Sequence, residues 1–149
     1  MSVLVDTNVL LRRVQRSHPS HAVAVESVAR LLATGESVYF TLQNIAEFWN
    51  VATRPASHNG LGFSSAVVLA EVANIEEDLE LLPDIPAIYA EWKRLVVRHG
   101  VVGVKVHDAR LVAPMNVHGV RPLLTFNAGD FARYGIEVVQ PAVVLEAPA

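Results

Sequence analysis

Residues 2–8 read SVLVDTN, a short aliphatic run that ends directly in three polar residues. The compact run SVLV contains two β-branched valines, which is typical of a strand buried on both faces. Asp6 follows at the carboxyl end of this strand, and Thr7 and Asn8 can begin a helix. The stretch therefore predicts the first strand and the first helix of an α/β fold.

Short β-rich runs and longer helical patterns alternate along the rest of the chain. Further strands are predicted at 37–40, 79–82, 121–126 and 137–140, and helices at 7–14, 19–33, 42–53, 64–78, 84–99 and from 107 onward. Asp84 is expected to cap its helix, and Pro114 to kink or shorten the last one. Strands separated by helices imply a parallel sheet covered on both faces. We therefore expect one domain over residues 1–149, with a three-layer α/β/α, Rossmann-like fold.

The composition fits a globular protein and excludes several classes of site. Of the 149 residues 52% are hydrophobic, and the absence of cysteine excludes disulfides, thiolate zinc sites and cysteine nucleophiles. No apolar run reaches the roughly 18 residues of a membrane helix, and the N-terminus has no signal-peptide pattern. A cytoplasmic location is the resulting expectation.

The formal net charge of −3 is not typical of a nucleic-acid-binding protein. Arg12, Arg13 and Arg16 nevertheless form a local basic cluster soon after the first strand. The cluster is either a solvated helix end or a contact for nucleic-acid phosphates.

Polar residues follow two predicted strands. Asp6 follows the first, and Thr125, Asn127 and Asp130 follow the strand that contains PLLTF. Helix or turn capping would explain Asp6 and Asp130. However, ligands of open α/β sheets gather beyond the carboxyl ends of the strands, so these residues are also candidates for a functional site.

Two further acids lie on predicted helices. Asp108 shares a helix face with the apolar Leu111 and Met115, where a carboxylate is costly unless it is paired, hydrogen-bonded or bound to metal. By spacing alone, Glu47 lies on a polar face with Asn44, which indicates a solvated surface. If several carboxylates converge at the sheet edge, their mutual repulsion favours a bound cation. Oxygen ligands suit Mg²⁺ or Mn²⁺, the metals of many phosphoryl-transfer enzymes.

Four segments, in their order and spacing, resemble those of PIN domains across nearly the whole chain, and in particular those of the VapC toxins of toxin–antitoxin pairs. They are VDTNVLL, NIAEFWNV, VKVHDARLVA and LLTFNAGDF. The resemblance implies that Asp6, Glu47 and Asp108 bind metal. Asp130 would be the fourth acidic ligand, although Asn127 stands where many relatives place an acid, so the fourth ligand lies between these two.

The resemblance also implies the surroundings of the metal ligands and the reaction. Asn8 would support Asp6, and Thr125 would line the same edge. The implied activity is Mg²⁺- or Mn²⁺-dependent hydrolysis of RNA phosphodiester bonds, which leaves 5′-phosphate and 3′-hydroxyl ends. The implied partners are RNA, a VapB-like antitoxin and a second copy of the chain in a homodimer. No histidine is required, and the six histidines are interpreted as ordinary surface or core residues.

Several alternatives remain at this point. The chain could be a PIN nuclease that processes RNA without an antitoxin, or a catalytically silent PIN fold that acts as a binding scaffold. A phosphatase of the haloacid-dehalogenase type would have an aspartate where Asn8 stands. A response-regulator receiver would have acids just before Asp6 and a lysine after a late strand, and the sequence has neither.

Overall fold

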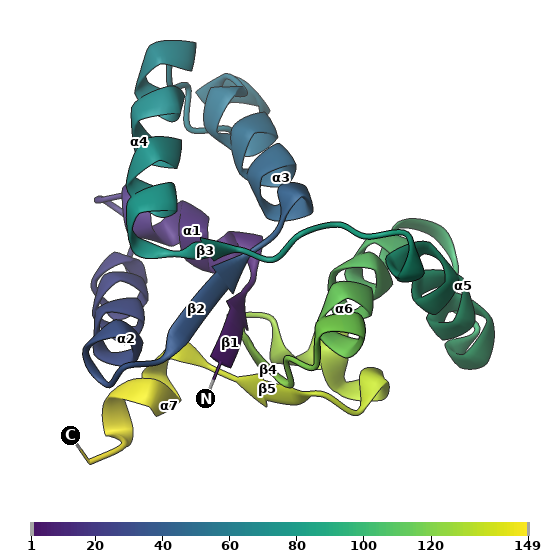
Figure 1. Cartoon of the computed structure of the whole chain (residues 1–149). Helices are drawn as coiled ribbons and strands as arrows, with labels where there is room; N and C mark the ends of the chain where they lie inside the picture. Colours follow the sequence, from purple (N-terminus) through teal and green to yellow (C-terminus); the bar gives the residue numbers. More distant parts are fainter. Residues whose placement is uncertain (1, 149) are drawn as a thin grey trace.

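The computed structural model describes residues 2–148, and its centre is a five-stranded sheet in which all neighbouring strands run parallel (Figure 1). The strands are β1 (Ser2–Val5), β2 (Ser37–Phe40), β3 (Glu80–Leu81), β4 (Pro122–Leu124) and β5 (Glu137–Val139). Their order in the sheet is β3-β2-β1-β4-β5. The first strand of the chain is thus the central one, and it pairs with β4 from the far end of the sequence.

Helices cover both faces of the sheet (Figure 1). They are α1 (Thr7–Val14), α2 (His21–Ala33), α3 (Leu42–Thr53), α4 (Ser65–Asp78), α5 (Ala87–His99), α6 (Val106–His118) and α7 (Pro141–Glu146), with 3₁₀ helices η1 (Ala56–His58), η2 (Gly103–Lys105) and η3 (Ala128–Tyr134). Val3 and Val5 of β1 pack in one apolar cluster with α1 to α4 and α7, whereas Leu4 packs in the other with α5 and α6. This alternation along a buried strand produces the three layers. The predicted α/β/α fold is confirmed.

Most predicted elements form close to their predicted positions, with three differences. The prediction that Asp84 caps α5 is wrong, because α5 begins at Ala87 without a side-chain cap and the Asp84 carboxylate pairs with Arg110. Of the two effects expected of Pro114, the shortening of α6 is contradicted, because the helix continues four residues further to His118. The helix α7 is not among the predicted helices; it follows β5 and begins at Pro141, a residue whose fixed φ suits a first helical turn.

The first residues of α3 form a hydrogen-bond network that connects this helix to α1. Thr41 Oγ1 accepts from the Asn44 backbone N–H at 3.2 Å, and Asn44 Oδ1 accepts from the Thr41 backbone N–H at 2.8 Å. Asn44 also donates to Thr7 Oγ1 at 3.1 Å and is fully buried. The prediction that Asn44 lies on a solvated face is therefore wrong, because a reciprocal capping box removes its amide from water.

No helix between Ser2 and Pro148 combines the length and the apolar character that crossing a bilayer requires.

Candidate active site

Asp6 lies at the carboxyl end of β1 and caps α1. Its backbone N–H donates to the carbonyl oxygen of Leu124 in β4 at 2.9 Å, and its Oδ1 accepts from the Thr7 backbone N–H at 2.7 Å. The capping interpretation is therefore correct, but it occupies one of about four acceptor positions on the carboxylate. The other oxygen takes part in a separate network.

Two polar side chains orient Asp6 Oδ2. The Thr125 hydroxyl donates to it at 2.7 Å, and the Asn8 amide donates both to it and to Thr125 Oγ1, each at 3.3 Å. The backbone N–H of Asn127 also donates to Thr125 Oγ1, at 3.0 Å. Thr7 thus uses one acceptor position on Oδ1 of Asp6, and Asn8 and Thr125 use the two on Oδ2. One acceptor position of the carboxylate, on Oδ1, remains beyond these.

The electrostatic surroundings of Asp6 disfavour its negative charge. Burial, with a smaller contribution from the negative charges of Glu47 and Asp108, raises the pKa of Asp6 from 3.8 to about 6. Hydrogen bonds from Thr125 and Thr7 oppose this shift without cancelling it. A cation beside Asp6 would offset both the loss of hydration that burial causes and the repulsion from Glu47 and Asp108.

Asp108 and Glu47 approach the same edge from two helices on opposite faces of the sheet. Asp108 lies in the first turn of α6 with its side chain 29% exposed, and Glu47 lies exposed on α3. Burial raises the pKa of Asp108, and the charges of Asp130 and Glu47 add to this, whereas Lys105 lowers it. The solvated-face interpretation of Glu47 is correct for its exposure but incomplete, since Glu47 acts electrostatically on both aspartates.

The segment after β4 brings Asp130 to this edge. Asp130 Oδ1 accepts from Lys105 Nζ at 2.9 Å, and the same ammonium lies 3.9 Å from Asp108 Oδ2. The charge of Asp130 and its hydrogen bond raise the pKa of Lys105. Asn127, the alternative fourth position, contributes its backbone N–H to Thr125.

The donor set is chemically suited to a hard divalent cation, because every candidate ligand offers carboxylate or amide oxygen. Across residues 2–148, however, no group of three or more acidic or histidine side chains is gathered closely enough to hold a metal ion. One of these acids, Asp130, is instead paired with the ammonium of Lys105.

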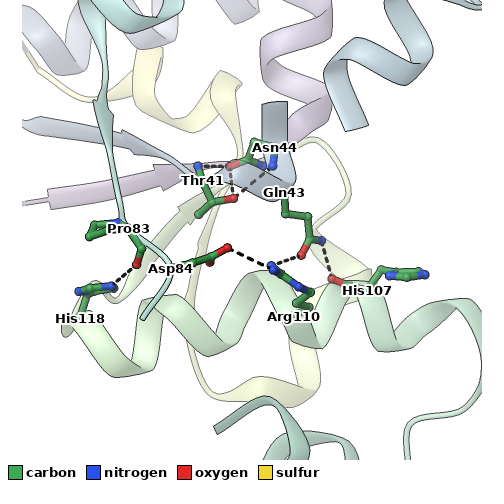
Figure 2. Close-up of polar contacts among 8 residues, drawn as sticks. All are labelled: Thr41, Gln43, Asn44, Pro83, Asp84, His107, Arg110 and His118. Atoms are coloured by element: carbon green, nitrogen blue, oxygen red, sulfur yellow. Dashed lines mark hydrogen bonds and ion pairs between the residues drawn. The ribbon is translucent and has the colours of Figure 1, made fainter. Parts of the chain in front are cut away.

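A row of polar contacts joins α3 to α6 beside the acidic edge. Figure 2 shows the Gln43 amide donating to the backbone oxygen of His107 at 2.8 Å. Arg110 donates to Gln43 Oε1 at 3.0 Å and pairs with Asp84 at 3.3 Å (Figure 2). These contacts border a groove of about 620 Å³ that also contains Glu47 and Leu42.

Sequence reasoning missed Lys105, Gln43 and Arg110. Lys105 could have been found, because it stands three residues before Asp108, a spacing that brings side chains together on a helix. Gln43 and Arg110 are 67 positions apart, and no pattern in the sequence pairs them.

The arginine cluster lies away from Asp6, at the other end of α1 and just beyond it. Arg12 donates to Gln15 at 2.9 Å, Arg13 pairs with Asp78 at 3.2 Å, and Arg16 is exposed.

The histidines are distributed over the fold. His18 accepts from the Ser20 N–H, His21 contacts the Arg12 carbonyl, His58 contacts Ser57, His99 packs edge-on against Tyr134, His107 lies beside Asp108, and His118 contacts the Pro83 carbonyl.

A family model, the PIN domain, matches residues 3–137, which include every acidic residue of the candidate site. No curated protein matches the chain by sequence.

Three solved structures illustrate the structural similarity. The toxin VapC20 of Mycobacterium tuberculosis, described as cleaving the sarcin–ricin loop, superposes with a TM-score of 0.68 at 20% identity, covering 90% of this chain and 95% of that chain. VapBC2 from Rickettsia felis, bound to a DNA fragment from its promoter, gives 0.68 at 14% identity, covering 94% and 98%. FitAcB from Neisseria gonorrhoeae gives 0.62 at 21% identity, covering 94% and 98%. At these identities the similarity shows a shared fold.

Proposed function

The chain belongs to the PIN domain family, and on this basis we propose that it is a metal-dependent endoribonuclease, acting as the toxin of a toxin–antitoxin pair. The observation that carries the proposal is the position of Asp6. It ends the central strand, is oriented by Asn8 and Thr125, and lies within the electrostatic reach of Glu47 and Asp108. Metal-dependent hydrolysis of a phosphodiester bond uses such an acidic edge to hold its cation.

We assign the metal ligands to this edge. Asp6 and Asp108, with Glu47 and Asp130, would hold Mg²⁺ or Mn²⁺ through their carboxylate oxygens. When bound, the metal supplies an activated water and neutralises charge that develops on the phosphate. The chain itself holds Asp6 in one orientation, since the Thr125 hydroxyl and the Asn8 amide both donate to its Oδ2.

RNA would lie along this edge and the neighbouring groove. Arg110 and the Gln43 amide border that groove and carry donors suited to phosphate or base oxygens. Arg12, Arg13 and Arg16 remain a proposed second contact for RNA, further along α1. Attraction between RNA phosphates and these arginine side chains would allow binding despite the net charge of −3.

We also propose a VapB-like antitoxin and a homodimer as the assembly, in the cytoplasm. Structures similar to this chain include one described as a toxin–antitoxin complex, from Klebsiella pneumoniae, and the toxin VapC20. The apolar side of the groove, with Leu42 59% exposed, offers a surface for the antitoxin segment that would cover the acidic edge. Light scattering of the purified chain should give the mass of a dimer, and a monomer at high concentration would contradict that part.

The experiment that tests the activity is incubation of the purified protein with mixed cellular RNA and Mg²⁺ or Mn²⁺. Cleavage should disappear with EDTA and in Asp6→Asn. The control Glu137→Gln should keep full activity, because Glu137 is exposed at the start of β5, at the edge of the sheet opposite to the acidic edge. Cleavage that persists in Asp6→Asn would contradict the assigned site, and no cleavage together with no metal binding would indicate a silent scaffold.

Expression in cells separates a toxin from an RNA-processing nuclease. We expect the wild-type chain to arrest growth and Asp6→Ala to relieve the arrest. An active nuclease that leaves growth unchanged would favour a role in RNA processing without an antitoxin.

A further inference from the structure

The ammonium of Lys105 already lies between two of the acids at the edge. Its Nζ is 2.9 Å from Asp130 Oδ1 and 3.9 Å from Asp108 Oδ2. The three side chains are partly exposed, at 48% for Lys105, 40% for Asp130 and 29% for Asp108. They therefore form a compact, solvent-accessible group in which one positive charge is shared by two negative ones.

The backbone around Lys105 is held from both neighbouring helices. The indole N–H of Trp92 in α5 donates to the Val106 carbonyl at 2.8 Å, and Gln43 of α3 donates to the His107 carbonyl at 2.8 Å (Figure 2). Lys105 directly precedes these two residues at the junction of η2 and α6. The start of the lysine side chain is thus fixed on the side of Asp108 and Asp130.

The position of the Lys105 ammonium is incompatible with a second divalent ion at the same place. Nucleases with two metals hold the ions about 3.5–4 Å apart, so that a shared carboxylate contacts both. If Asp6 and Asp108 bind one ion, the second ion would lie between Asp108 and Asp130. Lys105 Nζ already contacts both of these carboxylates, and an ammonium and a divalent ion cannot occupy one position.

We propose that Lys105 is a built-in cation that replaces a second metal between Asp108 and Asp130, so that the chain binds one divalent ion. This inference rests on the proposed metal-dependent function. Lys105 supplies one positive charge and N–H donors in place of a second metal. Asp130, proposed above as the fourth ligand, then pairs with the lysine, and Asp6, Asp108 and Glu47 remain to hold the single ion.

Titration with Mn²⁺ by calorimetry tests this inference through stoichiometry, independently of RNA cleavage. Wild-type protein should bind one Mn²⁺, whereas Lys105→Ala should bind two. The double variant Lys105→Ala with Asp130→Asn should return to one. Lys93→Ala is the matched control, because Lys93 is an exposed lysine on α5, and it should bind one ion as the wild type does.

Electron paramagnetic resonance gives a second measurement on the same samples. Two Mn²⁺ ions about 4 Å apart are magnetically coupled, so Lys105→Ala at saturation should show a coupled spectrum and wild type an isolated-ion spectrum. Lys105→Met, which keeps the aliphatic stem, should give the same result and covers the case in which the alanine variant is unstable.

Each alternative outcome has a distinct meaning. Two ions in the wild type, or one ion in both Lys105 variants, would overturn the role of Lys105 and leave the proposed metal site intact. Absence of Mn²⁺ binding in the wild type and in Lys105→Ala would overturn both proposals.

Discussion

Asp6 combines a structural and an electrostatic role in one side chain. It caps α1 through Oδ1 and accepts hydrogen bonds from Thr125 and Asn8 through Oδ2. These bonds favour the carboxylate, but burial and the neighbouring acids act more strongly, and the pKa of Asp6 is about 6. In the metal-free protein, the charged form of Asp6 therefore costs stability.

The first prediction concerns the pH dependence of folding without metal. Because the pKa of Asp6 is about 6 in the folded state against 3.8 for the free side chain, folding favours its protonated form. This contribution is present below pH 3.8 and is lost as the pH rises through 6. From pH 4 to 7, wild type should lose about 2 kcal/mol of unfolding free energy relative to Asp6→Asn.

Urea unfolding in EDTA at several pH values measures this difference. Mg²⁺ should restore stability to wild type at pH 7 and have little effect on Asp6→Asn. A difference between the two proteins that does not vary with pH would contradict the electrostatic explanation.

The second prediction concerns Thr125, which positions Asp6. Thr125→Val keeps the shape of this fully buried side chain but removes the hydroxyl that donates to Asp6. We expect Mn²⁺ affinity to fall about 10- to 100-fold, as for other partners of metal ligands. Thr125→Ser should restore it. Thr53→Val, which removes a hydroxyl bonded to Trp49 in α3, is the control and should leave the affinity unchanged.

Among the elements, α3 is the one whose start is most strongly determined. Thr41 and Asn44 form a reciprocal capping box, and Asn44 also bonds Thr7 of α1. The amide thus connects two helix starts beside the acidic edge. Buried polar groups in such a network are costly to leave without partners.

Replacement of Asn44 should therefore cost more than loss of an ordinary cap. We expect Asn44→Ala to lower the unfolding free energy by about 2–3 kcal/mol, because two buried partners lose their bonds. Ser64→Ala removes the exposed cap of α4 and should cost about 1 kcal/mol. Thermal unfolding of both variants measures the two losses of unfolding free energy. Equal losses would contradict the stabilising role of the hydrogen bond between Asn44 and Thr7.

The elements also show what the sequence can predict. The pattern SVLVDTN correctly predicts β1 and the start of α1, because a buried strand and its following cap are local features. A helical wheel places Asn44 in solvent, because it cannot represent a capping box formed with Thr41. Asp84 likewise has the sequence position of a cap, yet its partner Arg110 lies 26 residues away.

At the scale of the whole molecule, β1 separates two apolar clusters. Val3 and Val5 belong to one and Leu4 to the other, so a single strand of four residues supports both faces of the sheet. Three of its four residues, Val3, Leu4 and Val5, are therefore part of the packed core.

The whole-molecule prediction follows from this position. Leu4 is completely buried, and Leu4→Ala should lower the unfolding free energy by about 2–5 kcal/mol. Leu69→Ala is the control, because Leu69 is 61% exposed on α4, and its effect should stay within about 0.5 kcal/mol. Urea unfolding measures both, and similar losses would contradict the central role of β1.

The layers of the fold can be predicted from the sequence, whereas the order of the strands and the contact of Lys105 with Asp130 cannot. Alternation of strands and helices implies parallel crossovers, and this is enough to predict the layers. The pairing of β1 with β4 across the chain is a tertiary feature, and so is the position of Lys105 beside Asp130, 25 residues later. Spacing along the sequence does not encode such contacts.

The hydrogen bond between Asp6 and Thr125 spans 119 positions of the chain. During translation Asp6 is therefore made long before its hydroxyl partner Thr125. A nascent or prematurely terminated chain that ends before β4 lacks the strand that pairs with β1 and the residues that hold Asp6 in place. For the proposed ribonuclease, unfinished chains of this kind are expected to be inactive until β4 has been made.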